Sequence, residues 1–154
     1  MARTKVLRAV PQLCDGCRMC ELVCSIGKGG AVNPHLARIR VGRSEKDGSP
    51  RPIICRHCKV AQCQLVCPVP EAILLIESTG ALAIDTSKCT GCMACVEGCP
   101  FGAIWVGPTG EILKCDLCDG DPLCVKHCPY RPENSMPHLQ WPRQSCLQYV
   151  ERKR

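Results

Sequence analysis

Four runs of four cysteines constrain this chain more than any other feature of its sequence. The first run is Cys14, Cys17, Cys20 and Cys24, and the third, with the same gaps of two, two and three residues, is Cys89, Cys92, Cys95 and Cys99. The second run is Cys55, Cys58, Cys63 and Cys67, and the fourth is Cys115, Cys118, Cys124 and Cys128; in both, only the middle gap is longer. A seventeenth cysteine, Cys146, stands apart. Such a density of cysteine indicates either a disulfide framework or bound metal.

The beginning of the chain favours metal over disulfides. The sequence MARTKVLRAVPQLC has neither the apolar stretch of a signal peptide nor a twin-arginine address, so we do not expect export to an oxidising compartment. No run approaches the roughly 20 apolar residues that a membrane span requires. We therefore expect a soluble, cytoplasmic protein whose cysteines bind metal.

The spacing within the runs selects the kind of metal centre. A zinc ribbon uses C-x2-C pairs a dozen or more residues apart and has no use for a third cysteine three positions after the second. The first and third runs instead match the bacterial ferredoxin signature, in which the fourth cysteine ligates the neighbouring cluster. Gly16 and Gly91 lie inside these loops and permit tight turns. The sequence thus predicts four [4Fe-4S] clusters held by sixteen cysteines.

The formal net charge of +6 does not indicate nucleic-acid binding in this chain. A [4Fe-4S]2+ core held by four thiolates carries a charge of about −2, because ligating thiols are deprotonated. Four such clusters would bring the net charge from +6 to roughly −2. The excess of Lys and Arg therefore compensates cluster charge, and we interpret the terminal residues 152–154 as a solvated tail.

Between the runs, the pattern predicts short hairpins and not long helices. Three hairpins are expected, formed by residues 37–41 with 52–54, 73–77 with 81–85, and 103–106 with 111–114. Only helices of one or two turns fit inside the runs, for example at residues 19–25 and 93–98. The chain has one Phe, two Trp and two Tyr, so something other than aromatic side chains must fill its core. The prediction is a small α+β protein built around its cofactors.

Residues 14–129 resemble a known family, the four-cluster iron-sulfur subunits of molybdenum and tungsten oxidoreductases such as formate dehydrogenase and dimethyl sulfoxide reductase. The resemblance rests on CRHC in the second run, CTGCMACVEGCPFGAI in the third, and KCDLC with CVKHCP in the fourth. Only DGDPL separates the second and third cysteines of the fourth run, which is similar to a compact branch of the family. Within that branch, CDGCRMCELVCS and NPHLARIRV look most like the small subunits of tungsten aldehyde oxidoreductases and of carbon monoxide dehydrogenase partners.

The resemblance implies two nested ferredoxin-like units, each with two clusters. An outer unit, residues 1–36 and 111–130, and an inner unit, residues 50–106, would form a four-cluster domain over residues 1–130. The outer unit would hold one cluster through Cys14, Cys17, Cys20 and Cys128, and its neighbour through Cys115, Cys118, Cys124 and Cys24. The inner unit would hold one through Cys55, Cys58, Cys63 and Cys99, and another through Cys89, Cys92, Cys95 and Cys67. Residues 131–154 form an apolar tail that we expect to wrap the core or to dock on a partner.

A close row of one-electron centres is a path for electrons, so we expect an electron-transfer subunit and no catalytic residues. The chain has no glycine-rich phosphate loop and no dinucleotide fingerprint. The resemblance implies relay between a catalytic subunit, with tungsten or molybdenum, and an acceptor subunit or ferredoxin of a cytoplasmic oxidoreductase complex. A freestanding polyferredoxin and a metalloenzyme maturation factor are the alternatives, and a two-ended row could also stack on copies of itself.

Three more side chains near the runs could bind metal. His57 and His127 stand beside cysteines, but with sixteen cysteines available we expect them to form hydrogen bonds or to face solvent. Cys146 could replace a ligand or pair with a partner, and we interpret it as a free thiol.

Overall fold

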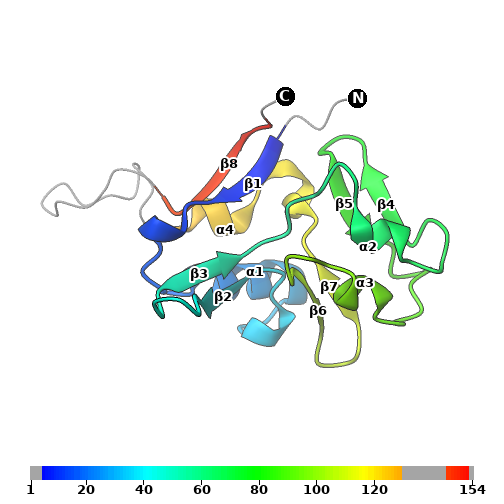
Figure 1. Ribbon diagram of the computed structural model, residues 1–154, viewed down its shortest axis with the longest axis horizontal. Helices are drawn as coiled ribbons and strands as arrows, with labels where there is room; N and C mark the ends of the chain where they lie inside the picture. The colour runs from blue at the N-terminus through cyan, green and yellow to red at the C-terminus, as the bar shows by residue number, and fades with distance from the viewer. Residues whose placement is uncertain (1–4, 130–144, 153–154) are drawn as a thin grey trace, which may run out of the picture.

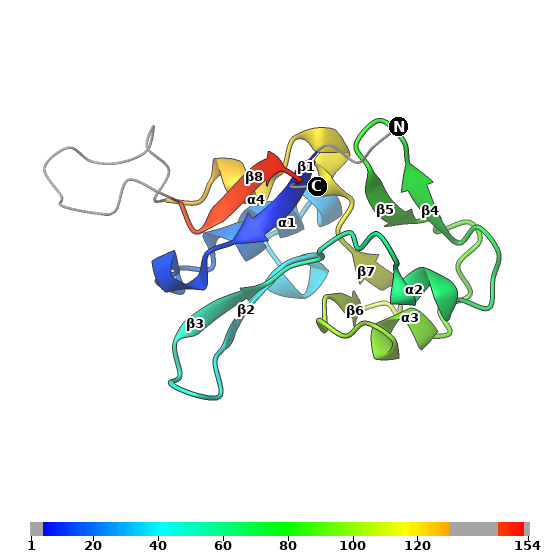
Figure 2. The same ribbon diagram turned by 45° about the horizontal axis from the view of Figure 1, so that its top comes forward.

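The computed structural model describes residues 5–129 and 145–152, which form short helices and two-stranded antiparallel sheets (Figures 1 and 2). This confirms the predicted α+β class. The helices are α1 (Met19–Gly29), α2 (Gln62–Leu65), α3 (Ala94–Glu97) and α4 (Leu123–Lys126), and the 3-10 turns are η1 (Pro11–Leu13), η2 (Pro34–Leu36) and η3 (Leu117–Gly120). Over the described ranges, no helix has the length and apolar character needed to cross a membrane.

Three of the sheets are hairpins between consecutive strands, and they are the three predicted hairpins. They pair β2 (Arg40–Arg43) with β3 (Pro50–Ile53), β4 (Ile73–Ile76) with β5 (Ala81–Ile84), and β6 (Ile104–Val106) with β7 (Ile112–Lys114). The first hairpin begins three residues later than predicted. There, η2 occupies the preceding turn, and Ala37 and Ile39 are buried in the core before the strand starts.

The fourth sheet joins two segments that lie far apart in the sequence. Strand β1 (Lys5–Ala9) pairs with β8 (Leu147–Glu151), and the two lie side by side in both ribbon views (Figures 1 and 2). Neither strand is predicted from the sequence, because pairing between distant segments leaves no local turn signal. The end of the predicted tail, residues 145–152, therefore packs against the start of the chain, while residues 131–144 lie outside the described residues.

Helix α1 is longer than predicted. The helix expected at residues 19–25 continues to Gly29 and ends at Gly30, which has a φ of +68°. Gly27 and Gly29 would weaken an isolated helix. Here each glycine makes room for a neighbour, since a Cβ at Gly27 would overlap Leu123 of α4 and one at Gly29 would overlap Leu36 of η2. Packing against α4 and η2 therefore extends the helix beyond its intrinsic propensity.

Buried side chains gather in two cores. The first core consists of Leu7, Cys20, Cys24, Ala37, Ile39, Val41, Ala81, Leu117, Cys124, Val125, Cys128, Cys146 and Leu147. The second core consists of Ala61, Cys63, Ile73, Leu82, Cys95, Ile104 and Ile112. In the described part of the chain, no aromatic residue is among the buried members of either core. Cysteines and small aliphatic side chains take their place.

Candidate metal centres

Three small cavities are each lined by three cysteines of one run and a fourth cysteine from another run. Group 1 is Cys14, Cys17, Cys20 and Cys128. Group 3 is Cys55, Cys58, Cys63 and Cys99. Group 4 is Cys89, Cys92, Cys95 and Cys67. The structure thus brings together the same cysteines that the family resemblance groups.

The remaining four cysteines, which we name group 2, are Cys24, Cys115, Cys118 and Cys124. Cys24 and Cys124 belong to the first core and Cys115 packs against it, while Cys118 acts electrostatically on both Cys24 and Cys124. Burial raises the pKa of the Cys124 thiol well above its usual value, and nearby cysteines, among them the other three of group 2, raise it further. Two backbone N–H groups point at sulfurs of this group. Arg38 donates to Cys24 Sγ at 3.2 Å, and Leu117 donates to Cys115 Sγ at 3.5 Å.

Electrostatic effects between cysteines give the order of the groups. Burial is the largest cause of the raised pKa values of Cys124, Cys115 and Cys95, and in each case a cysteine of another group adds to it. The pairs that link one group to the next are Cys20 with Cys124, Cys55 with Cys115, and Cys63 with Cys95. Groups 1 to 4 therefore follow one another in a row, with groups 2 and 3 where the two cores meet.

The arrangement of the cysteines bears on the kind of metal centre they can hold. None of the seventeen cysteines forms a disulfide bond. Within the residues that the structure describes, no three His, Cys, Asp or Glu side chains converge as a single metal ion requires. A zinc ion would hold its sulfurs about 2.3 Å from one point, whereas a four-iron cluster takes its four thiolates around its outside. Four cysteines around one cavity are the ligand set that a [4Fe-4S] cluster takes, and the described residues form no compact single-ion site.

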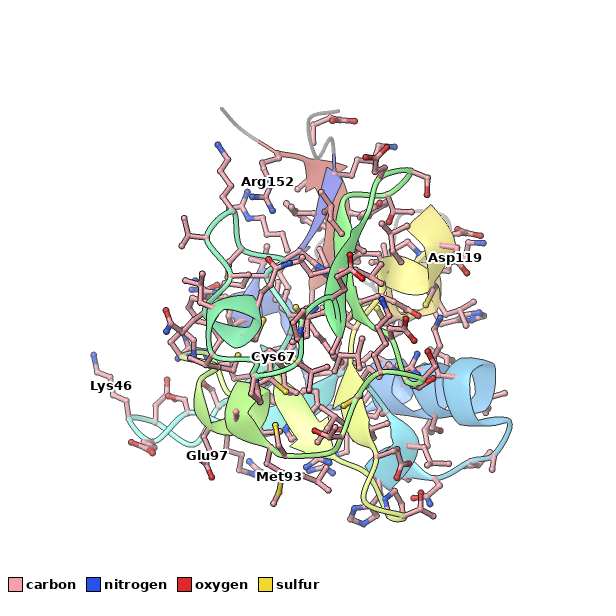
Figure 3. All side chains as sticks on the ribbon, turned by 90° about the vertical axis from the view of Figure 1, so that its right-hand side faces the viewer. Lys46, Cys67, Met93, Glu97, Asp119 and Arg152 are labelled. Carbon is pink, nitrogen blue, oxygen red and sulfur yellow. The ribbon has the colours of Figure 1, made fainter. Side chains whose placement is uncertain are left out.

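The first and third runs form the same loop. Gly16 and Gly91 have φ values of +81° and +70°, and two residues later Arg18 and Met93 have φ values of +58° and +64°. Left-handed residues reverse the chain direction, and glycine adopts this conformation without strain. Arg18 and Met93 also precede the first residues of α1 and α3. Figure 3 views the group 4 side of the molecule, with Met93 and Cys67 labelled.

Several of these thiols are too buried to ionise readily by themselves. Burial raises the pKa of Cys20 and of Cys115 to about 12 and that of Cys95 to about 11. Because iron is ligated by the thiolate, ionisation must accompany metal binding. Loading these groups should therefore release protons and stabilise the fold in the same step.

A charged network holds group 2 together. Asp116 accepts hydrogen bonds from Lys28 Nζ at 2.7 Å, Arg38 Nη1 at 3.3 Å and the Cys118 N–H at 3.1 Å. Burial alone would raise the pKa of Asp116, but the hydrogen bonds and the nearby cations lower it. The network joins α1 to the fourth run and so brings Cys24 to its group. It was not predicted, because Asp116 lies 88 and 78 residues from Lys28 and Arg38.

Three side chains near the cysteine runs were not expected to be cluster ligands, namely His57, His127 and Cys146. His57 is buried, and its Nδ1 accepts a hydrogen bond from the Leu82 N–H at 3.0 Å, which anchors it to β5. His127 is exposed. Cys146 is only 2% exposed and lines the cavity of group 1 as a fifth cysteine.

Lys114, at the end of β7, was not singled out from the sequence, yet it lies between groups 2 and 3. Its Nζ is 3.4 Å from Cys55 Sγ and 3.4 Å from the Cys115 carbonyl oxygen, and it donates to the Leu82 carbonyl oxygen. The side chain therefore contacts a sulfur of one group and the backbone of the other.

Cysteine groups of this kind in a small α+β fold define a ferredoxin-type iron-sulfur protein. The comparison with known families agrees with that class. The chain belongs to the family described as the 4Fe-4S dicluster domain, whose model matches residues 49–135, and a second model, described as a 4Fe-4S binding domain, matches residues 11–29.

Similar proteins are subunits of oxidoreductase complexes. The polyferredoxin-like subunit of the aliphatic sulfonate oxidoreductase of Pyrococcus furiosus is 39% identical over 120 residues, covering 77% of this chain and 68% of the relative. Formate hydrogenlyase subunit 2 of Escherichia coli K12 is 33% identical over 155 residues, covering 76% and 74%. A chain of the active site complex BamBC of benzoyl coenzyme A reductase, bound to benzoyl-CoA, superposes with a TM-score of 0.51 at 26% identity, covering 96% of this chain and 80% of that one. The chain is thus an electron-transfer iron-sulfur subunit and not itself a catalytic one.

Proposed function

We propose that this chain holds four [4Fe-4S] clusters, one at each cysteine group, and relays single electrons along the row from group 1 to group 4 or in the reverse direction. The observation that carries the proposal is that sixteen cysteines fall into four groups of four, linked in one row. When bound, each cluster supplies a one-electron redox centre.

The chain's own groups hold the clusters and adjust their surroundings. The buried cysteines would shield a bound cluster from water. Backbone N–H groups of Arg38, Ala103 and Leu117 donate to cysteine sulfurs at 3.2, 3.4 and 3.5 Å. Hydrogen bonds to a charged acceptor are strong, so these donors stabilise the thiolates and any further negative charge that an electron adds.

The division into two cores supports the nested arrangement. In our proposal, groups 1 and 2 belong to an outer unit of residues 1–36 and 111–130, and groups 3 and 4 belong to an inner unit of residues 50–106. Together these make up a domain of residues 1–130. The segment 131–154 then acts as a wrapping or docking tail, in keeping with the pairing of β8 and β1.

A groove beside group 3 supports the docking of a partner protein. No carboxylate lines this groove. Apolar side chains of β1 and β3 line it together with four arginines, which are Arg8, Arg51, Arg56 and Arg152. The Arg56 guanidinium lies 4.0 Å from the centre of the Phe101 ring, and both residues also line the cavity of group 3. Arginine and aromatic side chains are enriched at protein interfaces. We propose that an acidic segment of a partner subunit binds here.

The partners that we propose are a catalytic subunit with tungsten or molybdenum, of the aldehyde oxidoreductase type, and an acceptor subunit or ferredoxin. The complex would be cytoplasmic. Subunit function in the relatives from Pyrococcus furiosus and Escherichia coli supports a partner of some kind.

Anaerobic purification, native mass spectrometry and iron and sulfide analysis test this function. We expect about 16 iron and about 16 sulfide per chain, together with a larger metal-cofactor subunit. Cys95→Ser should lose iron from group 4, whereas the matched variant Cys146→Ser should keep all of it. Two zinc ions, or little iron, would overturn the proposal. Full iron without a partner would favour the freestanding carrier.

The docking part has its own test. The double variant Arg8→Glu/Arg51→Glu should weaken the complex at least tenfold, which is about 1.4 kcal/mol, without changing the iron content, because neither residue lines a cluster cavity. The effect should shrink as salt rises, since exposed charges are screened. Lys46→Glu/Lys126→Glu makes the same change of charge at exposed positions away from the groove and should leave the affinity unaltered. Equal affinities for both double variants would place the interface elsewhere.

A further inference from the structure

Lys114 is a buried cation at the junction of the two cores. All three residues of β7 are buried, and Lys114 is 4% exposed. Its Nζ meets three acceptors, which are the carbonyl oxygens of Leu82 and Cys115 and the sulfur of Cys55. An ammonium has three N–H donors, so each donor has one acceptor.

No carboxylate balances this ammonium. In the described residues, Lys28, Lys88 and Lys126 each pair with an Asp or a Glu, whereas no ion pair is formed by Lys114. An isolated buried charge is costly unless an opposite charge lies beside it. The acidic groups that face Lys114 are the thiols of Cys55, Cys63 and Cys115, because Lys114 acts electrostatically on Cys63 and Cys115 and touches Cys55.

We propose that Lys114 is the counter-charge of the two middle centres, those of groups 2 and 3, and raises their reduction potentials above those of the two end centres. This inference rests on the proposed function, since it requires a cluster at each group. Reduction adds one electron and one negative charge to a centre, and the neighbouring donor centre loses that electron. The step moves an electron alone, from the donor centre to the acceptor centre.

The position of Lys114 makes the effect selective. The interaction energy of two charges falls as the distance between them grows, and screening by salt reduces it further. Groups 2 and 3 contact the ammonium, whereas groups 1 and 4 lie one step further along the row. The electron is therefore held preferentially at the junction of the two cores, and the end centres exchange electrons with partners.

Redox titration of the anaerobic holoprotein with dithionite, followed by electron paramagnetic resonance, tests the proposal. In Lys114→Met, the ratio of reduced to oxidised centres at a fixed potential should fall at least tenfold for one or both middle centres. That fall corresponds to about 59 mV for a one-electron couple. The end centres should shift less. Lys114→Arg keeps the charge and should stay close to the wild-type potentials. Lys46→Met removes a charge from an exposed position between β2 and β3 and should leave all four unchanged.

Other outcomes overturn the inference and leave the proposed function standing. Lys114 has no effect on the centres if both the wild-type protein and Lys114→Met contain full iron and their reduction potentials are the same. A uniform shift of all four centres would show a loss of packing and not of a local charge. If Lys114→Met does not load iron, Lys114→Arg decides: full iron with wild-type potentials supports the role of the charge, whereas failure of both variants to load shows that Lys114 serves folding alone. Wild-type protein without iron would instead overturn the proposed function itself.

Discussion

The two cores contain cysteine loops of the same form but support them in different ways. In the first core the loop leads into the eleven-residue helix α1, which the charged network at Asp116 and packing against α4 and η2 hold in place. In the second core the loops lead into the four-residue helices α2 and α3, flanked by hairpins. The loops at Gly16 and Gly91 have the same backbone conformation, so the cysteine spacing determines the loop. Long-range contacts determine the helices and strands that surround each loop.

Removal of iron should destabilise the two cores more than any substitution does. Cysteines are members of both cores, so chelation should unfold both, as in small metal-dependent domains. We expect hydrogen exchange to rise first in β4–β5, next to the shorter helices, and later in β1–β8. Circular dichroism and hydrogen exchange measured by mass spectrometry check this. A well-dispersed proton spectrum of the iron-free protein would contradict it.

Truncation of one leucine in each core should have the next largest effect. Leu117 in the first core and Leu82 in the second are each 1% exposed. Leu117→Ala and Leu82→Ala should each destabilise the holoprotein by about 2–5 kcal/mol. Anaerobic urea unfolding followed by circular dichroism measures the change, and Leu65→Ala, at an exposed position of α2, is the control. A much larger loss for Leu82 would show that the second core tolerates a cavity less well.

Loss of the Asp116 carboxylate should weaken the first core alone. Asp116→Asn removes the negative partner of Lys28 and Arg38, and a hydrogen bond to a charged group contributes about 1.5–3 kcal/mol. We therefore expect a lower unfolding midpoint and earlier release of iron from group 2. Glu71→Gln breaks an exposed ion pair in the other half and should cause no measurable change. Equal effects of the two substitutions would mean that the network does not support group 2.

Alanine in place of the loop glycines should have the smallest effect and should act equally in the two cores. Gly16 and Gly91 both have positive φ, which costs an L-residue roughly 1–2 kcal/mol. Gly16→Ala and Gly91→Ala should therefore lower stability by similar amounts, as measured by unfolding midpoints at full iron content. Because an added Cβ at Gly16 would meet Pro50 Cβ at 3.2 Å, a somewhat larger cost there would still agree.

The sequence predicted what depends on local spacing. The three hairpins and the short helices follow from turn residues and from the gaps between cysteines, and the left-handed residues at Gly16 and Gly91 follow from the shape of the loop. The grouping of cysteines from different runs came from family resemblance and not from spacing, since no local rule tells which fourth cysteine joins which loop. The ligands themselves stay a prediction for the iron analysis to check.

What the sequence did not predict depends on contacts between distant residues. Strands β1 and β8 pair across most of the chain, Asp116 meets Lys28 and Arg38 only in the folded state, and Lys114 reads as an ordinary exposed lysine in a short strand. The extension of α1 through two glycines is a similar case, because the neighbours that favour it are Leu123 and Leu36. Each of these features depends on tertiary packing, which secondary-structure propensity does not include.

The pairing of β1 with β8 bears on how the protein is made. Groups 3 and 4 are complete once Cys99 has left the ribosome, so iron can enter the second core while synthesis continues. Groups 1 and 2 wait for Cys124 and Cys128, and the strand that precedes the first run has no partner until residues 147–151 have been added. If four clusters are bound as we propose, a chain released early would carry half of its iron. It would also have an unpaired strand edge, the feature through which nascent proteins aggregate.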